Sequence, residues 1–199
     1  RIKQYLGTET DHTDLPSNVI NRITGDNKGR LYLLSGYKYL VKYDKKTDLF
    51  ETISNNSQTI SATENYLWIV ENNHIKQLNF STDKTTDYYR VNEKFQIKSL
   101  FESSNSKLYI GTENGLAMLD NNKIFNVIIP DISVSTIYED SRKNIWIGTI
   151  DNGIYKINRN GLTEHIYNKA TEHTLSSNII RDFCEDNFGQ IWIATFRGL

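Results

Sequence analysis

Polar side chains of the kinds that bind hydroxyl-rich small molecules recur along this chain at corresponding places of an internal repeat. Hydroxyl, amide, carboxylate and guanidinium groups together suit hydrogen bonding to sugar hydroxyls or to acidic sugars. The candidate ligand-binding residues are Asn18 and Asn178, which precede strand patterns, and Thr112, Glu113, Thr149, Asp151, Thr195 and Arg197, which follow them. The alternative is that the Asn and Thr side chains stabilise their own turns by bonding to the backbone.

Aromatic side chains offer a second kind of contact, stacking against a sugar ring. Tyr37 and Tyr39 are the candidates, because they lie in Ser35-Gly36-Tyr37-Lys38-Tyr39, where an extra residue interrupts the repeat. An irregular turn without a ligand explains the same insertion. The tryptophans lie instead in apolar strand patterns, so we expect them to be core anchors. They are Trp68, Trp146 and Trp192.

Residues that could support catalysis show no catalytic arrangement. The four histidines are scattered without the spacing of a metal site. Asp26, Asp140 and Asp186 recur, but at turn positions, so pairing them as general acid and base is unsupported. No glycine-rich phosphate loop leads into a helix. Cys184 is expected to be a small, partly buried core residue. We therefore expect no enzymatic activity, metal or cofactor.

The elements that position these residues are short strands. The clearest copy of the repeat alternates apolar and polar residues, as strands do, and is punctuated by Asp- and Gly-containing turns. The predicted strands of this copy are Val134–Tyr138, Ile145–Ile147, Ile154–Asn158 and Leu162–Tyr167. Four antiparallel strands in chain order make one blade of a β-propeller.

Five copies of this pattern fit along the chain, at intervals of about 40 residues, the period of four-stranded propeller blades. Their aromatic anchors are Tyr32, Trp68, Tyr109, Trp146 and Trp192. Three residues before each anchor lies a turn position, where Gly29 and Gly189 suit a left-handed backbone. Asn65 is the next-best residue for that conformation. Ser106 and Lys143 hold the position in the other copies, which predicts a turn that is not uniform.

The ends of the chain fall within blades. Ile2–Leu15 aligns without a gap with Leu162–Leu175, which predicts that the chain begins with an outer strand. It stops at Leu199, where a third strand is expected to start. About four and a half blades leave open edges that ring closure normally removes. We therefore expect an all-β fragment of a larger propeller, forming one domain over residues 1–199 with no second domain.

Composition narrows the class of protein. With 199 residues, 38% hydrophobic, 12% aromatic and 24% charged, the chain is ordinary for a globular protein. A net charge of −1 without basic runs predicts no binding to nucleic acid or to anionic membranes. No apolar run is long enough for a transmembrane helix. No signal peptide is evident, which does not determine the compartment.

Three elements at fixed spacing resemble a known family, the two-component regulator propeller repeat. They are Leu175-Ser176-Ser177-Asn178-x-Ile180, Glu185-Asp186-x-x-Gly189-x-Ile191-Trp192-Ile193-x-Thr195 and the following Gly198-Leu199. The resemblance covers most of the chain and is weakest around Trp68. It implies a periplasmic sensor region of a hybrid two-component system, built from two large propellers and a β-sandwich. A membrane span, histidine kinase, receiver and DNA-binding domain would follow elsewhere in the parent protein, which is expected to be a homodimer.

This resemblance leaves three hypotheses about function. The first is an extracytoplasmic sensor segment that detects an oligosaccharide or relays its detection. The second is a structural or dimerisation propeller without a ligand of its own, which the low net charge and the scattered candidate residues fit. The third is a propeller polysaccharide lyase or hydrolase, motivated only by the recurrent aspartates. Kinase activity would belong to a separate domain of the parent protein.

Overall fold

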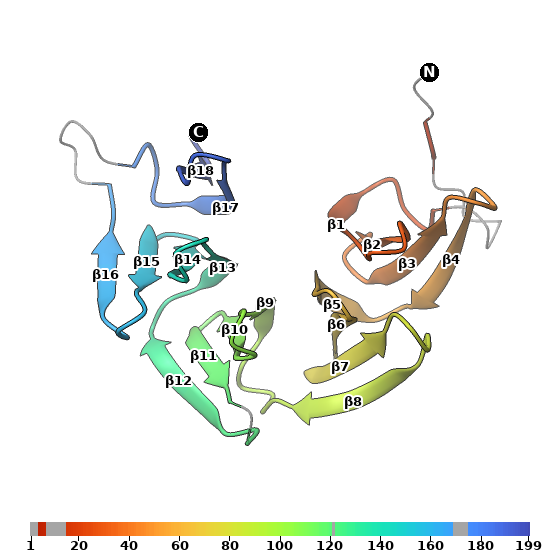
Figure 1. Cartoon of the computed structure of the whole chain (residues 1–199), viewed down its shortest axis with the longest axis horizontal. Coiled ribbons are helices and arrows are strands. Elements are labelled where there is room, and N and C mark those ends of the chain that lie inside the picture. The colour runs from red at the N-terminus through yellow and green to blue at the C-terminus, as the bar shows by residue number, and fades with distance from the viewer. Residues whose placement is uncertain (1–3, 7–14, 121, 169–174) are drawn as a thin grey trace. The chain divides into compact units, whose positions relative to one another are not determined.

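The computed structural model describes residues 4–6, 15–120, 122–168 and 175–199, and its regular structure is β-strand (Figure 1). The strands form four four-stranded sheets and one two-stranded sheet, each with its strands in chain order. We call these sheets blades 1 to 5. Residues 1–93 form one compact unit, which contains blades 1 and 2, and residues 94–199 form a second unit, which contains blades 3 to 5. The expected single domain over residues 1–199 stays a prediction.

In each blade, every strand pairs antiparallel with its neighbour in the chain. Blade 1 consists of β1 (Ile20–Gly25), β2 (Leu31–Ser35), β3 (Tyr39–Asp44) and β4 (Leu49–Ser54). Blade 2 consists of β5 (Ser57–Ala62), β6 (Tyr66–Glu71), β7 (His74–Asn79) and β8 (Thr85–Arg90). Blade 3 consists of β9 (Ile97–Glu102), β10 (Leu108–Thr112), β11 (Gly115–Leu119) and β12 (Phe125–Pro130).

The same order continues in blades 4 and 5. Blade 4 consists of β13 (Val134–Glu139), β14 (Ile145–Thr149), β15 (Ile154–Ile157) and β16 (Thr163–Ile166). Blade 5 consists of β17 (Ile180–Glu185) and β18 (Ile191–Thr195). All five expected anchors lie in the second strand of their blade, so the predicted blade pattern is confirmed. They are Tyr32, Trp68, Tyr109, Trp146 and Trp192.

The first strand of every blade contains a register shift near its start, which leaves one residue without a partner in the second strand. The skipped residues are Asn21, Gln58, Lys98, Ser135 and Arg181. A β-bulge increases the local twist and redirects a side chain. The repeat therefore includes a feature that simple alternation of apolar and polar residues did not predict.

The turn between the first and second strands has one left-handed residue in four of the five blades. These residues are Gly29 (φ 79°), Ser106 (φ 60°), Lys143 (φ 68°) and Gly189 (φ 76°). The expected lack of uniformity holds for blade 2, but the turns that contain Ser106 and Lys143 share the left-handed backbone of the glycine turns. Asn65 has no positive φ, because the turn of blade 2 is shorter and the N–H of Thr63 donates to the carbonyl of Tyr66 at 2.8 Å.

The recurring aspartates hold these turns, as the sequence predicted. Asp140 accepts the N–H of Asn144 and the indole Nε1–H of Trp146, both at 2.8 Å. Asp186 likewise accepts the Nε1–H of Trp192 at 2.9 Å. Burial alone would raise the pKa of Asp140, but the hydrogen bonds from Trp146 and Asn144 lower it below 3.8. Backbone and indole hydrogen bonds lower the pKa of Asp186. These carboxylates are ionised structural groups.

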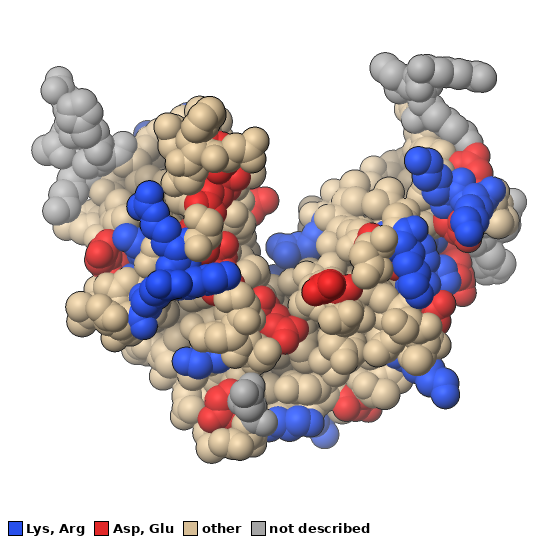
Figure 2. All heavy atoms as spheres, in the orientation of Figure 1, with Lys and Arg blue, Asp and Glu red and all other residues tan. Residues whose placement is uncertain are grey.

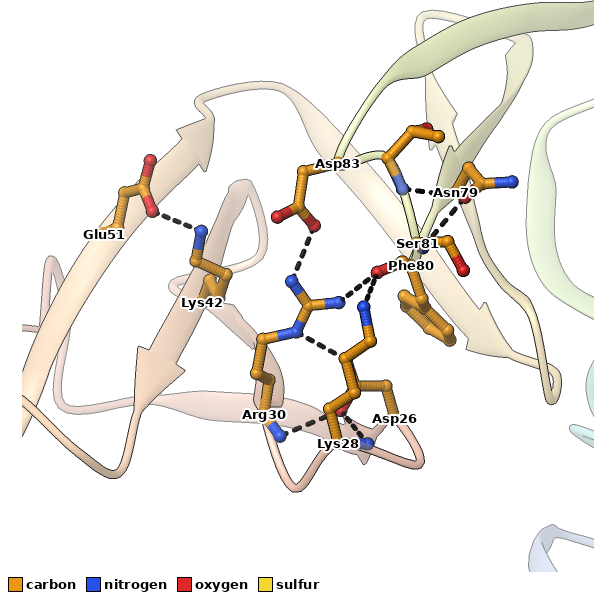
Figure 3. A network of polar contacts seen from close by, with 10 residues as sticks. Asp26, Lys28, Arg30, Lys42, Glu51, Asn79, Phe80, Ser81 and Asp83 are labelled. Carbon is orange, nitrogen blue, oxygen red and sulfur yellow. Dashed lines mark hydrogen bonds and ion pairs between the residues drawn. The ribbon is translucent and has the colours of Figure 1, made fainter.

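Blades 1 and 2 are joined by a cationic network inside the first unit (Figure 3). The guanidinium of Arg30 donates to the carbonyl of Phe80 at 2.7 Å and pairs with Asp83 at 2.6 Å. Its Nε pairs with Asp26 at 2.5 Å, and the ammonium of Lys28 donates to the same Phe80 carbonyl at 2.8 Å. The turn of blade 1 therefore fastens itself to the end of β7.

The second unit joins its blades by a different contact, which occurs twice. Glu139 of blade 4 accepts the N–H and the hydroxyl of Ser104 of blade 3 at 2.7 and 2.8 Å. Glu185 of blade 5 accepts the N–H and the hydroxyl of Ser141 of blade 4 at 2.7 and 2.6 Å. Each glutamate ends a first strand, so each fixes the tip of the preceding blade's turn.

The glycines of the Gly-Thr pairs lie where neighbouring blades approach one another. A Cβ added to Gly148 would lie 2.6 Å from Cγ2 of Ile180 in blade 5. A Cβ added to Gly111 would overlap the hydroxyl of Ser99 and lie 2.6 Å from Cγ1 of Val134 in blade 4. These separations are far below van der Waals contact, so a side chain at either position requires the neighbouring blade to move.

The core lies between the faces of neighbouring blades. Trp192 and Cys184 were both expected to be buried or partly buried, and both are exposed in blade 5. Tyr32 and Trp68 are 0% and 2% exposed, but Trp192 is 47% exposed. Cys184, its partner across the β17–β18 pair, is also exposed and is not the partly buried core residue expected. Blade 5 has two strands among the described residues, and the face that carries Trp192 and Cys184 is exposed.

At the start of the chain the described residues 4–6 form no strand, so the expected outer strand is not observed there. Tyr5 instead packs against Phe50 at 5.2 Å and Tyr43 at 5.7 Å between ring centroids, and its hydroxyl donates to Asp48 at 2.6 Å. The remainder of that predicted strand lies outside the described residues. In the described part of the chain, no helix is long and apolar enough to cross a membrane.

Candidate functional site

The three candidate threonines close their own loops. Each hydroxyl donates at 2.8 Å to a carbonyl within the same hairpin: Thr112 to Gly115, Thr149 to Gly153 and Thr195 to Gly198. Each also accepts a backbone N–H from its own loop. These hydroxyls therefore stabilise their own turns, as the alternative to ligand binding in the sequence analysis proposed.

Hydrogen bonds bring three loops of the second unit together at one end of blades 4 and 5. The N–H of Gly153, in the β14–β15 loop, donates to the carbonyl of Asn178 at 3.0 Å. The N–H of Phe196, after β18, donates to the carbonyl of Ile179 at 2.9 Å. Two of the predicted residues, Asn178 and Arg197, consequently lie beside one another.

These loops surround a pocket of about 310 Å³. It is lined by Asn168, Ser176, Ser177, Asn178, Ile179, Phe196 and Arg197. This volume is at the lower end of the range of small-molecule sites. Asn178 and Arg197 are the predicted candidates that it contains. The other lining residues were not predicted, although Ser176, Ser177 and Phe196 flank those two in the sequence.

The pocket presents hydrogen-bond donors next to an exposed ring. Asn178 lines the pocket, and its Oδ1 accepts the N–H of Asn168 at 2.6 Å. Among the described residues, the guanidinium of Arg197 has no ion-pair or hydrogen-bond partner. Phe196 is 62% exposed, and the guanidinium of Arg181 lies 5.7 Å from its ring centroid. Donors beside an aromatic face suit a ligand rich in oxygen acceptors.

The remaining candidates lie apart from this pocket. Glu113 pairs with the ammonium of Lys98, one of the bulge residues, at 2.5 Å. Asp151 is exposed and accepts the side-chain amide of Asn152 at 2.9 Å. Neither carboxylate is among the residues that line the pocket.

The first unit has a corresponding pair of loops at the same end of blade 1. The N–H of Gly36 donates to the carbonyl of Val19 at 2.8 Å, which places the segment of Asn18 beside Tyr37. Tyr37 is 75% exposed, and its N–H donates to Asn21, another bulge residue, at 2.8 Å. Tyr39 is partly buried in an apolar cluster, so it presents less surface than its sequence position suggested.

The bulge residues are a feature of the candidate-residue loops that sequence reasoning missed. Asn21 and Lys98 each contact the loop between the second and third strands of their own blade, and Arg181 contacts the segment that follows the second strand of blade 5. Their side chains therefore line the end of the blade that carries the candidate residues. In the described part of the chain, no group of three or more His, Cys, Asp and Glu side chains is arranged to hold a metal ion.

Comparison with known proteins identifies the repeat. Residues 128–151 and 174–197 match the two component regulator propeller family. These two segments therefore match the repeat of that family, which confirms the resemblance there. It is also 30% identical over 80 residues to Histidine kinase P4 of Formosa agariphila, a match that covers 34% of this chain and 6% of the kinase.

Solved structures show the same fold. An extracellular domain assigned to the hybrid two component system BT3049 of B. thetaiotaomicron matches 98% of this chain with a TM-score of 0.80 and 21% identity. Virginiamycin B lyase of Staphylococcus aureus also matches 98% of this chain, with a TM-score of 0.72 and 13% identity. The chain spans 28% of the first protein and 67% of the second. The fold is a β-propeller, of which this chain forms a part.

Proposed function

We propose that the chain is part of the extracytoplasmic sensor region of a hybrid two-component system, and that the pocket of blades 4 and 5 binds an oligosaccharide. The family repeats at residues 128–151 and 174–197, which contain most of that pocket, carry this proposal. The likeness to an extracellular domain of such a system and to a histidine kinase supports it. Kinase activity and the membrane span then belong to other parts of the parent protein, in which the sensor regions pair as a homodimer.

The pocket chemistry supports a glycan as the ligand. The amide of Asn178 and the guanidinium of Arg197 donate hydrogen bonds to ring or hydroxyl oxygens, and Phe196 offers an apolar face to a sugar ring. The committed threonine hydroxyls contribute indirectly, because they hold the loops that position these groups.

This proposal can be tested by measuring the binding of neutral and acidic oligosaccharides to the full-length parent protein. Thermal shift is used first to screen the sugars, and calorimetry then measures the binding. Binding to the folded state raises the apparent stability in a concentration-dependent way. We expect Arg197→Ala and Asn178→Ala each to weaken binding about tenfold. The matched control is Arg142→Ala, an exposed arginine in the turn at the other end of blade 4. Equal binding by all three variants would contradict the pocket assignment.

A structural or dimerisation role is the second candidate, favoured by the committed hydroxyls of Thr112, Thr149 and Thr195. If no oligosaccharide binds, this role is preferred. Comparing self-association of the parent protein with and without these blades then tests it. A lyase or hydrolase role has no support from the geometry, because Asp140 and Asp186 are held in turns.

A further inference from the structure

A second pocket lies at the opposite end of the strands in the second unit, where the turns of blades 3 and 4 meet. It has a volume of about 310 Å³. Three turns contribute to it: β9–β10, β13–β14 and β15–β16. Figure 2 shows lysine and arginine side chains gathered over the sheet of β13–β16. We propose that this pocket binds a small organic anion, through Lys107, Lys143 and Arg159.

Unpaired positive charge is the first observation behind this proposal. Lys107, Lys143 and Arg159 all line the pocket, and within the described chain none of their side chains has an ion-pair or hydrogen-bond partner. By contrast, Lys156 of blade 4 is paired with Glu164, and Arg30 and Lys76 of the first unit are also paired with carboxylates. Like charges held together without counter-charges repel one another, and an anion between them relieves that repulsion.

The carboxylate in this pocket does not supply the missing counter-charge by direct contact. Glu139 lines the pocket, but its two oxygens accept the N–H and the hydroxyl of Ser104 at 2.7 and 2.8 Å. The position of the Glu139 carboxylate is therefore set by its hydrogen bonds to Ser104 of blade 3. The three cations are therefore available to a ligand.

Backbone strain at Lys143 is the second, independent observation. Lys143 has a φ of 68°, a left-handed conformation that is unfavourable for residues with a Cβ. Blades 1 and 5 place Gly29 and Gly189 at the same position of the turn, where glycine has no such cost. Blade 4 therefore keeps a lysine at a position better suited to glycine, and this lysine lines the pocket.

The interior of the pocket suits a compact organic body. Tyr109 and Ile145 are 7% and 4% exposed and belong to the core between blades 3 and 4, and Ile157 packs against them. All three line the pocket. A ligand with one anionic group on a ring-sized body would therefore place its charge among the cations and its body against these side chains. A carboxylate and a phosphate ester share this chemistry.

Amide chemical shifts of the full chain, followed during titration, test this proposal. The probes are glucuronate, which carries a carboxylate, and glucose 6-phosphate, which carries a phosphate ester, with glucose as the neutral control. We expect at least one anionic probe to cause saturable shifts at residues 103–107, 140–144 and 158–161, and glucose to cause none. Preference between the probes identifies the anionic group. Equal shifts with glucose, or none with either anion, would overturn the proposal.

Lys143→Gly is the decisive variant, because it removes a cation and relieves the positive φ at the same time. We expect it to weaken binding of the anionic probe about tenfold while the thermal midpoint stays unchanged or rises. Lys46→Gln, at an exposed lysine of the β3–β4 turn, is the matched control and should bind as the parent chain does. Unchanged binding by Lys143→Gly would contradict the proposal. Arg197 lines only the oligosaccharide pocket, so Arg197→Ala should leave binding of the anionic probe unchanged. A failure of the anion proposal can therefore be told apart from a failure of the oligosaccharide proposal.

Discussion

The two units pack their blades by opposite distributions of side-chain volume. In the second unit, Gly148 lies in the anchor strand β14, two residues after Trp146, and is approached by Ile180 from the first strand of the next blade. In the first unit, the residue corresponding to Gly148 is Leu34 and the residue corresponding to Ile180 is Ser57, which are 4% and 0% exposed. The large residue is therefore on the first strand of the following blade in the second unit, and on the anchor strand of the preceding blade in the first unit. Close packing constrains the summed volume of an interface more tightly than the identity of each residue.

The polar links between blades differ in the same way. Arg30 and Lys28 reach a carbonyl of blade 2 in the first unit, whereas Glu139 and Glu185 receive serines of the preceding blade in the second. In both units the link starts or ends at the turn between the first and second strands. The link between neighbouring blades therefore involves the same turn in both units, whereas the residue types that form the link differ.

Gly148→Leu should have the largest effect, because it places a large side chain on both sides of the contact between blades 4 and 5. Its first added atom would lie 2.6 Å from Ile180 Cγ2 and 2.9 Å from Thr136 Cγ2, so we expect the free energy of unfolding to fall by about 3 kcal/mol. Adding Ile180→Ser reproduces the distribution of the first unit and should restore more than half of that loss. Urea denaturation of the single and double variants measures both. Strictly additive losses would show that the two positions do not share one space.

Asp140→Ala tests the turn that both units share. It leaves the N–H of Asn144 and the indole N–H of Trp146 without their acceptor, at a cost of about 2 kcal/mol of unfolding free energy. Asp151→Ala is the control, since it removes an exposed carboxylate and should change that free energy by less than about 0.5 kcal/mol. Thermal and urea unfolding compare the two variants.

Acidification should act on the turns of both units. The pKa values of Asp26, Asp140 and Asp186 are all lower in the folded chain than the ordinary 3.8. A lowered folded-state pKa contributes stability that is fully present above the unfolded value and is lost as the pH falls through the folded value. Unfolding free energy should therefore be constant above about pH 5 and fall below pH 3.8. Asp140→Asn should reduce this slope; an unchanged slope would contradict the assignment.

Tyr32→Phe should have the smallest effect, because the Tyr32 hydroxyl is buried without a hydrogen-bond partner among the described residues. Burial raises the pKa of this tyrosine to about 12. Removing the hydroxyl should stabilise the chain or cost less than about 0.5 kcal/mol. Tyr43→Phe provides the contrast, since the Tyr43 hydroxyl donates to Asp48 at 2.8 Å. Unfolding midpoints of the two variants separate these expectations.

The sequence predicted the blades because their signals are local. Strand alternation, the anchors and the aspartate turns each lie within one copy of the repeat, so comparing copies identified them. The bulges at Asn21, Lys98 and Arg181 were missed, because a skipped residue leaves an alternating pattern nearly intact. The left-handed Lys143 was also missed, since its conformation is imposed by the neighbouring turn and not by its own preference.

The candidate site was predicted only in part, because a pocket depends on contacts between loops distant in sequence. Asn178 and Arg197 were named from their positions in the repeat, and both line the pocket, while their role in binding stays a prediction. The threonines have the same polar character, yet hydrogen bonds within their own hairpins commit them to structure. The exposure of Trp192 depends on what covers its blade, which its own sequence does not record.

The hydrogen bonds from Trp146 and Trp192 to turn aspartates also give the molecule internal optical probes. Indole emission responds to a nearby carboxylate and to contact with water, so Trp146 and Trp192 each report whether the turn of their own blade is closed. Trp146 and Trp192 belong to the second unit and Trp68 to the first. Replacing two of the three with phenylalanine leaves a chain whose fluorescence follows a single blade. Loosening of one blade can then be detected while the other blades keep their structure.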